Sequence, residues 1–235
     1  MTRDRPQSIV VLTGAGISVE SGLPTFRGAD GLWEGHRVEE VASPDGFARE
    51  PLLVHRFYNL RRAALHQVEP NAAHLALARL EREWQGDFLL ITQNVDDLHD
   101  RAGSQRLLHM HGELRRARCT HCGASSSWVT ALSPQTACPS CVQTGGMRPD
   151  IVWFGEVPMH LEACFTALSQ ADLFVAIGTS VTVYPAAGFV SLVAARSETR
   201  TLELNQEATG NPLFHEVRLG RATETVPELV AELLA

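Results

Sequence analysis

The chain has 235 residues, 44% of them hydrophobic and 20% charged, which is enough for one substantial core or two modest ones. Twenty basic residues against 27 acidic ones give a formal net charge of −7, which argues against a general affinity for nucleic-acid phosphates or anionic membranes. All 20 basic residues are arginine, and the absence of lysine excludes Schiff-base chemistry and the lysine-containing P-loop.

The sequence carries no sign of export or of a membrane segment. No apolar run approaches the roughly 20 residues of a membrane span, and residues 1–8 are polar, without the hydrophobic region of a signal peptide. We therefore expect a cytoplasmic protein. In a reducing compartment, a tight group of four of the five cysteines indicates metal binding before disulfides.

Short apolar runs alternate along the chain with helical patterns. The runs typical of buried strands are residues 8–13, 87–92, 172–178 and 201–204. Apolar residues at helical spacing lie around Leu77, around Cys164 and, near the end of the chain, around Leu229. Strands that alternate with helices predict an α/β fold with a mostly parallel, doubly wound sheet.

Residues 112–152 break this rhythm, because they combine paired cysteines with little apolar periodicity. A segment of this size cannot be held together by hydrophobic burial alone, so a metal is expected to supply the missing stability. We expect a small zinc-ribbon domain at 112–152, inserted into a larger domain formed by residues 1–111 and 153–235. A further helical insertion is expected at about residues 28–66.

Four cysteines have the spacing of a structural zinc site. Cys119 and Cys122 form one C-x2-C pair, and Cys138 and Cys141 form a second pair after fifteen intervening residues. Four thiolates close a tetrahedron around one zinc ion and leave no open position for a reacting water. The predicted site is therefore structural, and His121 is expected to be a solvated loop residue.

The turn after the first predicted strand is rich in glycine. It contains the run Gly14-Ala15-Gly16-Ile17-Ser18, and glycines at this place allow a backbone to approach a pyrophosphate near a helix N-terminus. Val19 stands where the third glycine of the dinucleotide-binding pattern belongs, so a simple tight turn is an alternative. The continuation through Phe26 and Arg27 makes the pattern more specific, because it adds an aromatic ring and a cation.

With these residues the sequence resembles the sirtuins, which are NAD-dependent protein lysine deacylases. The shared motifs follow the family's order over nearly the whole chain: Gly14–Ser18, Gly22–Arg27, Gln93–Asp96, His109–Gly112, the four cysteines, Val152–Glu156 and Gly178–Ser180. The resemblance implies a Rossmann-like domain with a small zinc-containing domain. This agrees with the organisation read from periodicity and cysteine spacing.

The resemblance also implies which residues carry the chemistry. His111 matches the general base, a role that suits an imidazole at neutral pH, although a histidine before a glycine can also be a plain turn residue. Asn94 is the second expected catalytic residue, and with Gln93 and Asp96 it would line the pocket for nicotinamide and its ribose. His109 is expected to serve packing or orientation.

The expected NAD contacts extend over the carboxyl ends of several predicted strands. Ser18 and Arg27 would contact phosphates or ribose, and Phe26 would cover the reactive sugar carbon. The complete expected set is Gly14, Ala15, Gly16, Ile17, Ser18, Phe26, Arg27, Gln93, Asn94, Asp96, Gly178, Thr179, Ser180, Asn205, Glu207 and Ala222. Those from Gly178 onward would hold the adenosine half.

The implied reaction consumes NAD as a co-substrate. The acyl oxygen of a modified lysine displaces nicotinamide and gives an alkylimidate, and His111 deprotonates the ribose hydroxyl that attacks it. The products are free lysine, nicotinamide and O-acyl-ADP-ribose. The zinc takes no part, which fits four cysteines that saturate the metal.

Tyr58 and Arg61 resemble the Y-x-x-R pair of the class III sirtuins, which prefer acidic acyl groups such as succinyl, malonyl and glutaryl. Residues three apart share a helix face, and a guanidinium with a tyrosine hydroxyl can pair a buried carboxylate. Ala42 matches the small residue that widens the acyl pocket. The alternative is an ordinary solvated helix face, since Arg56 and Arg62 lie nearby. Deacetylation is expected as a slower or parallel activity.

The expected partners are acyl-lysine proteins or peptides. Val152, Phe154, Gly155 and Glu156 would flank the substrate, which in this family adds as a strand between the domains. We expect a monomer that binds neither nucleic acid nor membranes.

Two other functions remain open from the sequence. The first is mono-ADP-ribosyl transfer, which uses the same NAD site and the same bond cleavage. The second is a non-catalytic NAD-sensing protein with a zinc-ribbon binding module. His111 and the Tyr58/Arg61 pair favour deacylation over both.

Overall fold

The computed structural model describes residues 6–25, 33, 35–180 and 183–235. Two residues expected to contact NAD, Phe26 and Arg27, lie outside the described residues. In the described part of the chain, no helix is both long and apolar enough to cross a membrane.

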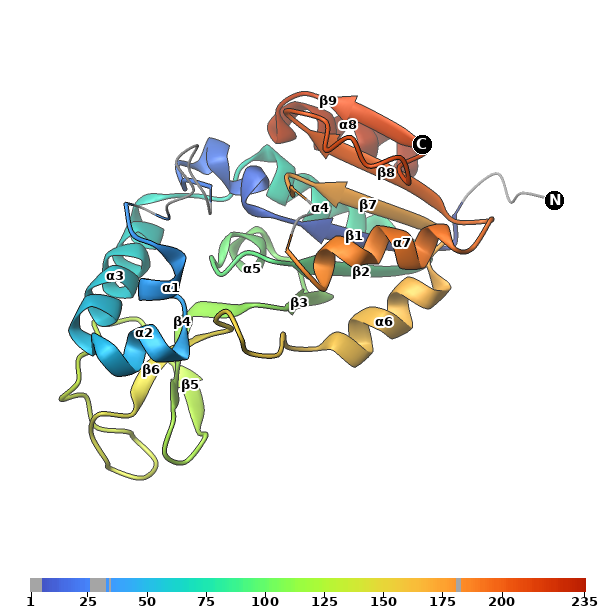
Figure 1. The fold of residues 1–235 in the computed structure, drawn as a ribbon. Helices are drawn as coiled ribbons and strands as arrows, with labels where there is room; N and C mark the ends of the chain where they lie inside the picture. The colour runs from blue at the N-terminus through green and yellow to red at the C-terminus, as the bar shows by residue number, and fades with distance from the viewer. Residues whose placement is uncertain (1–5, 26–32, 34, 181–182) are drawn as a thin grey trace.

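The larger part of the molecule is built on a six-stranded parallel sheet (Figure 1). Its strands are β1 (Ser8–Thr13), β2 (Asp87–Thr92), β3 (Leu107–His109), β7 (Leu173–Ile177), β8 (Arg200–Asn205) and β9 (Glu216–Leu219). Their spatial order is β3-β2-β1-β7-β8-β9. The chain thus extends the sheet in one direction from β1 and then in the other, which is the Rossmann order. The predicted doubly wound parallel sheet is confirmed.

Alternate residues of the central strands enter two separate cores. In β1, Ile9 and Val11 pack on one face of the sheet, and Val10 and Leu12 pack on the other. This alternation follows from the period of two along a strand, and burial on both faces explains the continuous apolar run.

Helices cover both faces of the sheet (Figure 1). The core that contains Ile9 is closed by α4 (Ala72–Glu83) and α8 (Ala222–Leu234). The opposite core is closed by α6 (Leu161–Gln170) and α7 (Phe189–Ala194). Asn71 caps α4, because its side chain accepts hydrogen bonds from the amides of Ala73 and His74.

The smaller part contains an antiparallel three-stranded sheet of order β5-β4-β6 (Figure 1). Its strands are β4 (Gly112–Cys119), β5 (Ser125–Ser127) and β6 (Met147–Ile151). The small core under this sheet contains five buried residues: Ala117, Cys119, Leu132, Cys138 and Met147. So few buried side chains do not stabilise an independent unit, which is the physical reason for a metal here.

Three helices stand on the small sheet and form a third core with it (Figure 1). They are α1 (Val38–Val41), α2 (Pro44–Arg49) and α3 (Pro51–Ala64). Asn59 of α3 exchanges two hydrogen bonds of 2.8 Å with the backbone of Leu132, and Arg62 donates to the Leu114 carbonyl at 2.7 Å. Hydrogen bonds as well as apolar packing therefore attach α3 to the segment that contains the four cysteines.

Short elements complete the connections. The glycine-rich turn after β1 continues into the 3-10 helix η1 (Ala15–Ser21), and α3 continues into the 3-10 turn η2 (Leu65–Gln67). Helix α5 (Leu98–Ala102) follows β2, and the 3-10 turn η3 (Ala186–Gly188) precedes α7.

The loops that follow β1 and β7 touch backbone to backbone. The amide of Gly16 donates to the carbonyl of Gly178 at 2.8 Å. A Cβ on Gly16 would lie 2.6 Å from Cα of Gly178, and a Cβ on Gly178 would lie 2.5 Å from the amide nitrogen of Ile17. Gly178 also has a φ of +58°, which favours glycine. These glycines are needed because no side chain fits between the two loops.

Gly178→Ala should therefore destabilise the protein more than the same substitution at a glycine that has a positive φ but no close neighbours. Gly210→Ala is the matched control, because Gly210 has a φ of +71° and no atom within 4 Å of its Cβ position. We expect Gly178→Ala to cost about 2 kcal/mol more in the free energy of unfolding, the usual cost of overpacking. Chemical denaturation measures both values, and equal costs would contradict the close-contact explanation.

Candidate functional site

One large cavity lies where the two parts of the molecule meet, and its volume is about 1240 Å³. One side is formed by the loops at the carboxyl ends of β1, β2, β7 and β8, the edge at which open α/β sheets bind ligands. The other side is formed by α3 and by the segment after β6. The volume exceeds the range of about 300–1,000 Å³ typical of a pocket for one small molecule.

Most of the residues expected to bind NAD line this cavity. They are Gly14, Ala15, Gly16, Ser18, Gln93, Asn94, Asp96, Gly178, Thr179, Ser180, Asn205, Glu207 and Ala222. Ile17 differs, because its side chain is fully buried in the core with Ile9 and Val11. The conformation of the turn directs the Ile17 side chain inward, away from the cavity.

Hydrogen bonds join the loops along the nucleotide side of the cavity. The Asn205 side chain donates to the Thr179 carbonyl at 3.1 Å, and the Gln93 side chain donates to the Thr179 hydroxyl at 2.9 Å. The loops after β2, β7 and β8 therefore form one continuous wall. Its backbone amides and glycines suit a dinucleotide that lies across the strand ends.

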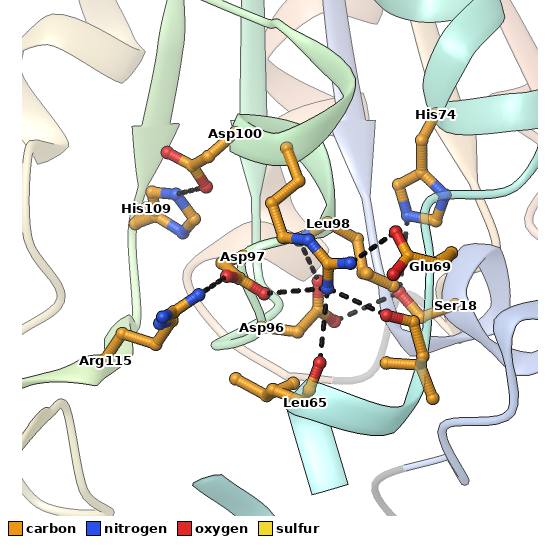
Figure 2. Close-up of polar contacts among 12 residues, drawn as sticks. Ser18, Leu65, Glu69, His74, Asp96, Asp97, Leu98, Asp100, His109 and Arg115 are labelled. Carbon is orange, nitrogen blue, oxygen red and sulfur yellow. Dashed lines mark hydrogen bonds and ion pairs between the residues drawn. The ribbon is translucent and has the colours of Figure 1, made fainter. Parts of the chain in front are cut away.

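A buried polar network lies at the centre of the cavity. The Asn94 amide donates to the Gly14 carbonyl at 3.1 Å and to the Ser18 hydroxyl at 3.2 Å. Ser18 donates to Asp96 Oδ2 at 3.0 Å, and Figure 2 shows the Ser18 hydroxyl between Asp96 and His74. Burial raises the pKa of Asp96 above its ordinary value, because a charge is costly at this depth.

His74 belongs to this network, although no sequence motif points to it. Its Nε2 lies 3.5 Å from the Ser18 hydroxyl, and burial lowers its pKa to about 4, so the ring is neutral at physiological pH. A histidine on the inner face of an amphipathic helix has no distinctive sequence signal. The polar capping contact between Asn71 and the His74 ring is visible only in three dimensions.

His111 lies in the passage from β3 to β4, where the chain leaves the large sheet for the small one. Its Nδ1 lies 3.1 Å from the carbonyl oxygen of Gln93. A carbonyl can only accept, so Nδ1 carries the proton and Nε2 is the basic nitrogen. Burial lowers the pKa of His111 below its ordinary value, and the hydrogen bond to Gln93 partly opposes this. The neutral imidazole is thus available as a base near neutral pH.

His109, two residues earlier, has different surroundings. Its Nε2 lies 3.0 Å from Asp100 Oδ2, and Figure 2 marks this contact with a dashed line. Burial lowers the pKa of His109, but the hydrogen bond and charge of Asp100 outweigh burial and raise it overall. Of these two histidines, His111 is therefore the one whose imidazole is held neutral.

The end of the cavity near α3 is lined by Tyr58, Arg61 and Ala42. Tyr58 is fully buried, and its hydroxyl accepts a hydrogen bond of 2.9 Å from the indole Nε1 of Trp153. The Arg61 guanidinium lies over the Trp33 ring, 4.4 Å from its centroid. Tyr58 and Arg61 therefore face the cavity together rather than forming a solvated helix surface.

The other arginines of α3 have different places. Arg62 is buried and donates to the backbone of Leu114, whereas Arg56 is exposed at the mouth of the cavity. Of the arginines of α3, Arg61 of the Y-x-x-R pair is thus the one that lies over aromatic rings within the pocket.

The segment after β6 forms the remaining wall. It contains the four residues expected to flank the substrate: Val152, Phe154, Gly155 and Glu156. The Phe154 amide donates to the Ala42 carbonyl at 2.9 Å, which fixes the segment to the helical insertion. Phe154 is 42% exposed and Tyr184, across the cavity mouth, is 79% exposed. Both leave apolar surface available to a bound chain.

The four cysteine sulfur atoms converge in the small domain, all within 4.8 Å of one another. The sulfurs of Cys119 and Cys141 are 3.8 Å apart, and those of Cys122 and Cys138 are 3.7 Å apart. A tetrahedral zinc with Zn–S bonds of about 2.3 Å places its sulfurs about 3.8 Å apart, so the residues fit this metal. His121 is exposed and contacts the Thr144 carbonyl, outside the sulfur group.

The fold and the site together define an α/β protein with a crevice at the strand ends, a half-buried neutral histidine and a separate four-cysteine metal site. The Sir2 family profile matches residues 14–185. The chain belongs to the Sir2 family, as its sequence motifs predict.

Individual relatives agree with this assignment. The sequence is 54% identical over 231 residues to an NAD-dependent protein deacylase of Bdellovibrio bacteriovorus, which covers 97% of each chain. It is 53% identical over 229 residues to a protein of the same description from Pasteurella multocida, covering 96% of this chain and 97% of the relative.

Solved structures agree as well. A Sir2 homologue in complex with NAD superimposes with a TM-score of 0.89 at 40% identity, covering 98% of this chain and 91% of the other. A Sir2 protein bound to an acetylated peptide gives a TM-score of 0.82 at 30% identity, covering 97% and 93%.

Removal of the metal should unfold the small domain selectively. We expect one zinc per chain in the purified protein and loss of that zinc in Cys138→Ser, because three thiolates leave the tetrahedron open. Hydrogen exchange should then show lost protection in β4 and β6 but retained protection in β1 and β2. Cys164→Ala is the control, since Cys164 lies in the core of the large domain and its change should leave the zinc bound. Retained zinc in Cys138→Ser would refute the site.

The activity attributed to His111 should depend on pH in a defined direction. A base must be unprotonated, and the pKa of His111 is lowered, so kcat/KM should be flat at neutral pH and fall only below about pH 6.5. His111→Ala should lower turnover by about 10²- to 10⁴-fold while NAD binding persists. His66→Ala, which alters an exposed histidine outside the cavity, is the control. Unchanged turnover in His111→Ala would exclude the base role.

Proposed function

We propose that this protein is an NAD-dependent protein lysine deacylase, which converts an acyl-lysine and NAD to lysine, nicotinamide and O-acyl-ADP-ribose. The observation that carries the proposal is one cavity whose lining includes the strand-end loops, His111, and Tyr58 with Arg61. Such an arrangement brings a dinucleotide and an acylated side chain to one reacting point. The curated relatives described above are named for this activity.

The large domain, with residues 1–111 and 153–235, would hold NAD along the loops after β1, β2, β7 and β8. NAD supplies an electrophilic ribose carbon with nicotinamide as the leaving group. Asn94, oriented by Gly14 and Ser18, would hold the nicotinamide ribose. His111 would accept a proton from a ribose hydroxyl at Nε2 while the Gln93 carbonyl keeps its Nδ1 protonated. The zinc domain, residues 112–152, would support the wall opposite.

We infer further that the preferred acyl groups are acidic ones such as succinyl, malonyl and glutaryl. A carboxylate can enter a buried pocket only when it is paired, because desolvation of an unpaired charge is costly. Arg61 supplies a fixed cation there, and Tyr58 supplies a hydroxyl whose proton is retained, since burial raises its pKa. Ala42 leaves room beside them. Acetyl-lysine is a slower substrate.

The substrate peptide would lie along the segment from Val152 to Glu156 as an added strand, with the exposed rings of Phe154 and Tyr184 beside it. Backbone hydrogen bonds bind such a strand with little dependence on its sequence. The net charge of −7 favours peptides that are rich in lysine.

Arg61→Met tests the acidic-acyl assignment. On otherwise identical peptides, we expect the ratio of kcat/KM for succinyl-lysine to that for acetyl-lysine to fall by about 10- to 100-fold, the effect of losing a charged hydrogen-bonded pair. Mass spectrometry of the two peptides, with and without NAD, measures this ratio. Arg56→Met is the matched control, because it removes an exposed arginine at the cavity mouth. An unchanged ratio in Arg61→Met would make the protein an ordinary deacetylase.

A further inference from the structure

Trp153 connects the acyl pocket with the small sheet. It is 2% exposed and lies two residues after the end of β6. Its ring stacks on Tyr58, with centroids 6.2 Å apart and an angle of 29° between the ring planes. Its indole Nε1 donates to the Tyr58 hydroxyl at 2.9 Å. Phenylalanine could not replace it, because its ring has the apolar surface but lacks the N–H.

The direction of this hydrogen bond determines what Tyr58 can do. The indole is a donor only, so the tyrosine oxygen is the acceptor and the tyrosine proton is left for a different acceptor. Hydrogen bonds that follow one another in a chain polarise each other in a medium of low dielectric constant. A hydroxyl that accepts from Trp153 is therefore both oriented and strengthened as a donor to a carboxylate in the pocket.

Arg148 and Glu156 hold the indole in place. The guanidinium carbon of Arg148 lies 3.2 Å from the centroid of the Trp153 ring. Two nitrogens of Arg148 donate to the two oxygens of Glu156, at 2.7 and 2.9 Å. Glu156 also accepts from the Trp153 amide at 2.8 Å. The ring and the backbone of Trp153 are thus fixed by the ion pair of the buried Arg148 with the partly exposed Glu156, and the Arg148 cation stacks on the ring.

We propose that Trp153 is a specificity-determining positioning residue, whose indole N–H aims the Tyr58 hydroxyl at the carboxylate of an acidic acyl group. The Arg148–Glu156 pair holds the indole in the orientation that this hydrogen bond requires. This inference rests on the acidic-acyl function proposed above. It also gives the zinc domain a part in selectivity, because β6 carries Arg148 and begins at Met147, which packs with Cys119 in the small core.

Trp153→Phe removes the hydrogen bond and keeps most of the ring. We expect the succinyl-to-acetyl ratio of kcat/KM to fall by about 3- to 10-fold, the effect of one hydrogen bond, mainly through the KM of the succinyl peptide. In a Tyr58→Phe background the same change should alter the ratio by less than about twofold, because the shared bond is already lost. Trp84→Phe, in the core of the large domain, is the control for a general effect of losing an indole.

The outcomes separate this inference from the function on which it rests. A wild-type protein that removes succinyl no better than acetyl overturns the acidic-acyl proposal and this inference with it. A succinyl-to-acetyl ratio that is unchanged in Trp153→Phe, or a fall of equal size with and without the Tyr58 hydroxyl, overturns this inference alone. NAD binding and the midpoint of thermal unfolding identify a variant that fails to fold.

If a variant fails to fold, a measurement on the wild-type protein still tests the inference. The indole ¹⁵N–¹H resonance of Trp153 is assigned by its nuclear Overhauser contact with the Tyr58 ring and followed while each peptide is added. Succinyl-lysine peptide should shift this resonance, and acetyl-lysine peptide should leave it nearly in place. Equal shifts with both peptides overturn the inference.

Discussion

The close approach of the loops after β1 and β7 is the constraint on which the rest of the site depends. Where the connections that follow two adjacent parallel strands lead to opposite sides of the sheet, a crevice is left at the carboxyl ends of these strands. Here Gly16 and Gly178 let the two backbones meet at its base. The glycines therefore allow both the tight turn and the crevice. The two explanations of the glycine-rich run, a tight turn and a nucleotide site, are compatible with the same geometry.

A second dependence runs from the metal site toward the acyl pocket. The small domain has too few buried side chains to hold β4 and β6 in place without a metal. These strands in turn support α3 and the segment that begins at Val152. Zinc therefore remains outside the proposed chemistry, yet the cavity wall that carries Tyr58 and Arg61 depends on the domain that the metal holds together.

Much of this arrangement could be predicted from the sequence, because the strongest signals are local. Strands such as β1 are buried on both faces and read as continuous apolar runs, and the cysteine spacing fixes four ligands directly. Edge strands such as β3 and β9 were missed because each has only three or four residues, too few for a pattern.

Contacts between distant segments were beyond sequence reasoning. The Tyr58–Trp153 hydrogen bond joins residues 95 positions apart, and His74 carries the same helical spacing as an ordinary core residue. The inward direction of Ile17 was also unpredictable, because it depends on how the 3-10 turn packs against the sheet. Local periodicity specifies which elements form, whereas tertiary packing decides which side chains meet.

The measurement that tests the central claim most directly is the fate of the ADP-ribose. A succinyl-lysine peptide is incubated with the protein and NAD, and all products are identified by mass spectrometry. Deacylation predicts one nicotinamide and one O-succinyl-ADP-ribose for each free lysine released. ADP-ribose attached to protein or peptide while the succinyl group stays on lysine would contradict the account in favour of transfer, and bound NAD without nicotinamide release would contradict it in favour of a sensor.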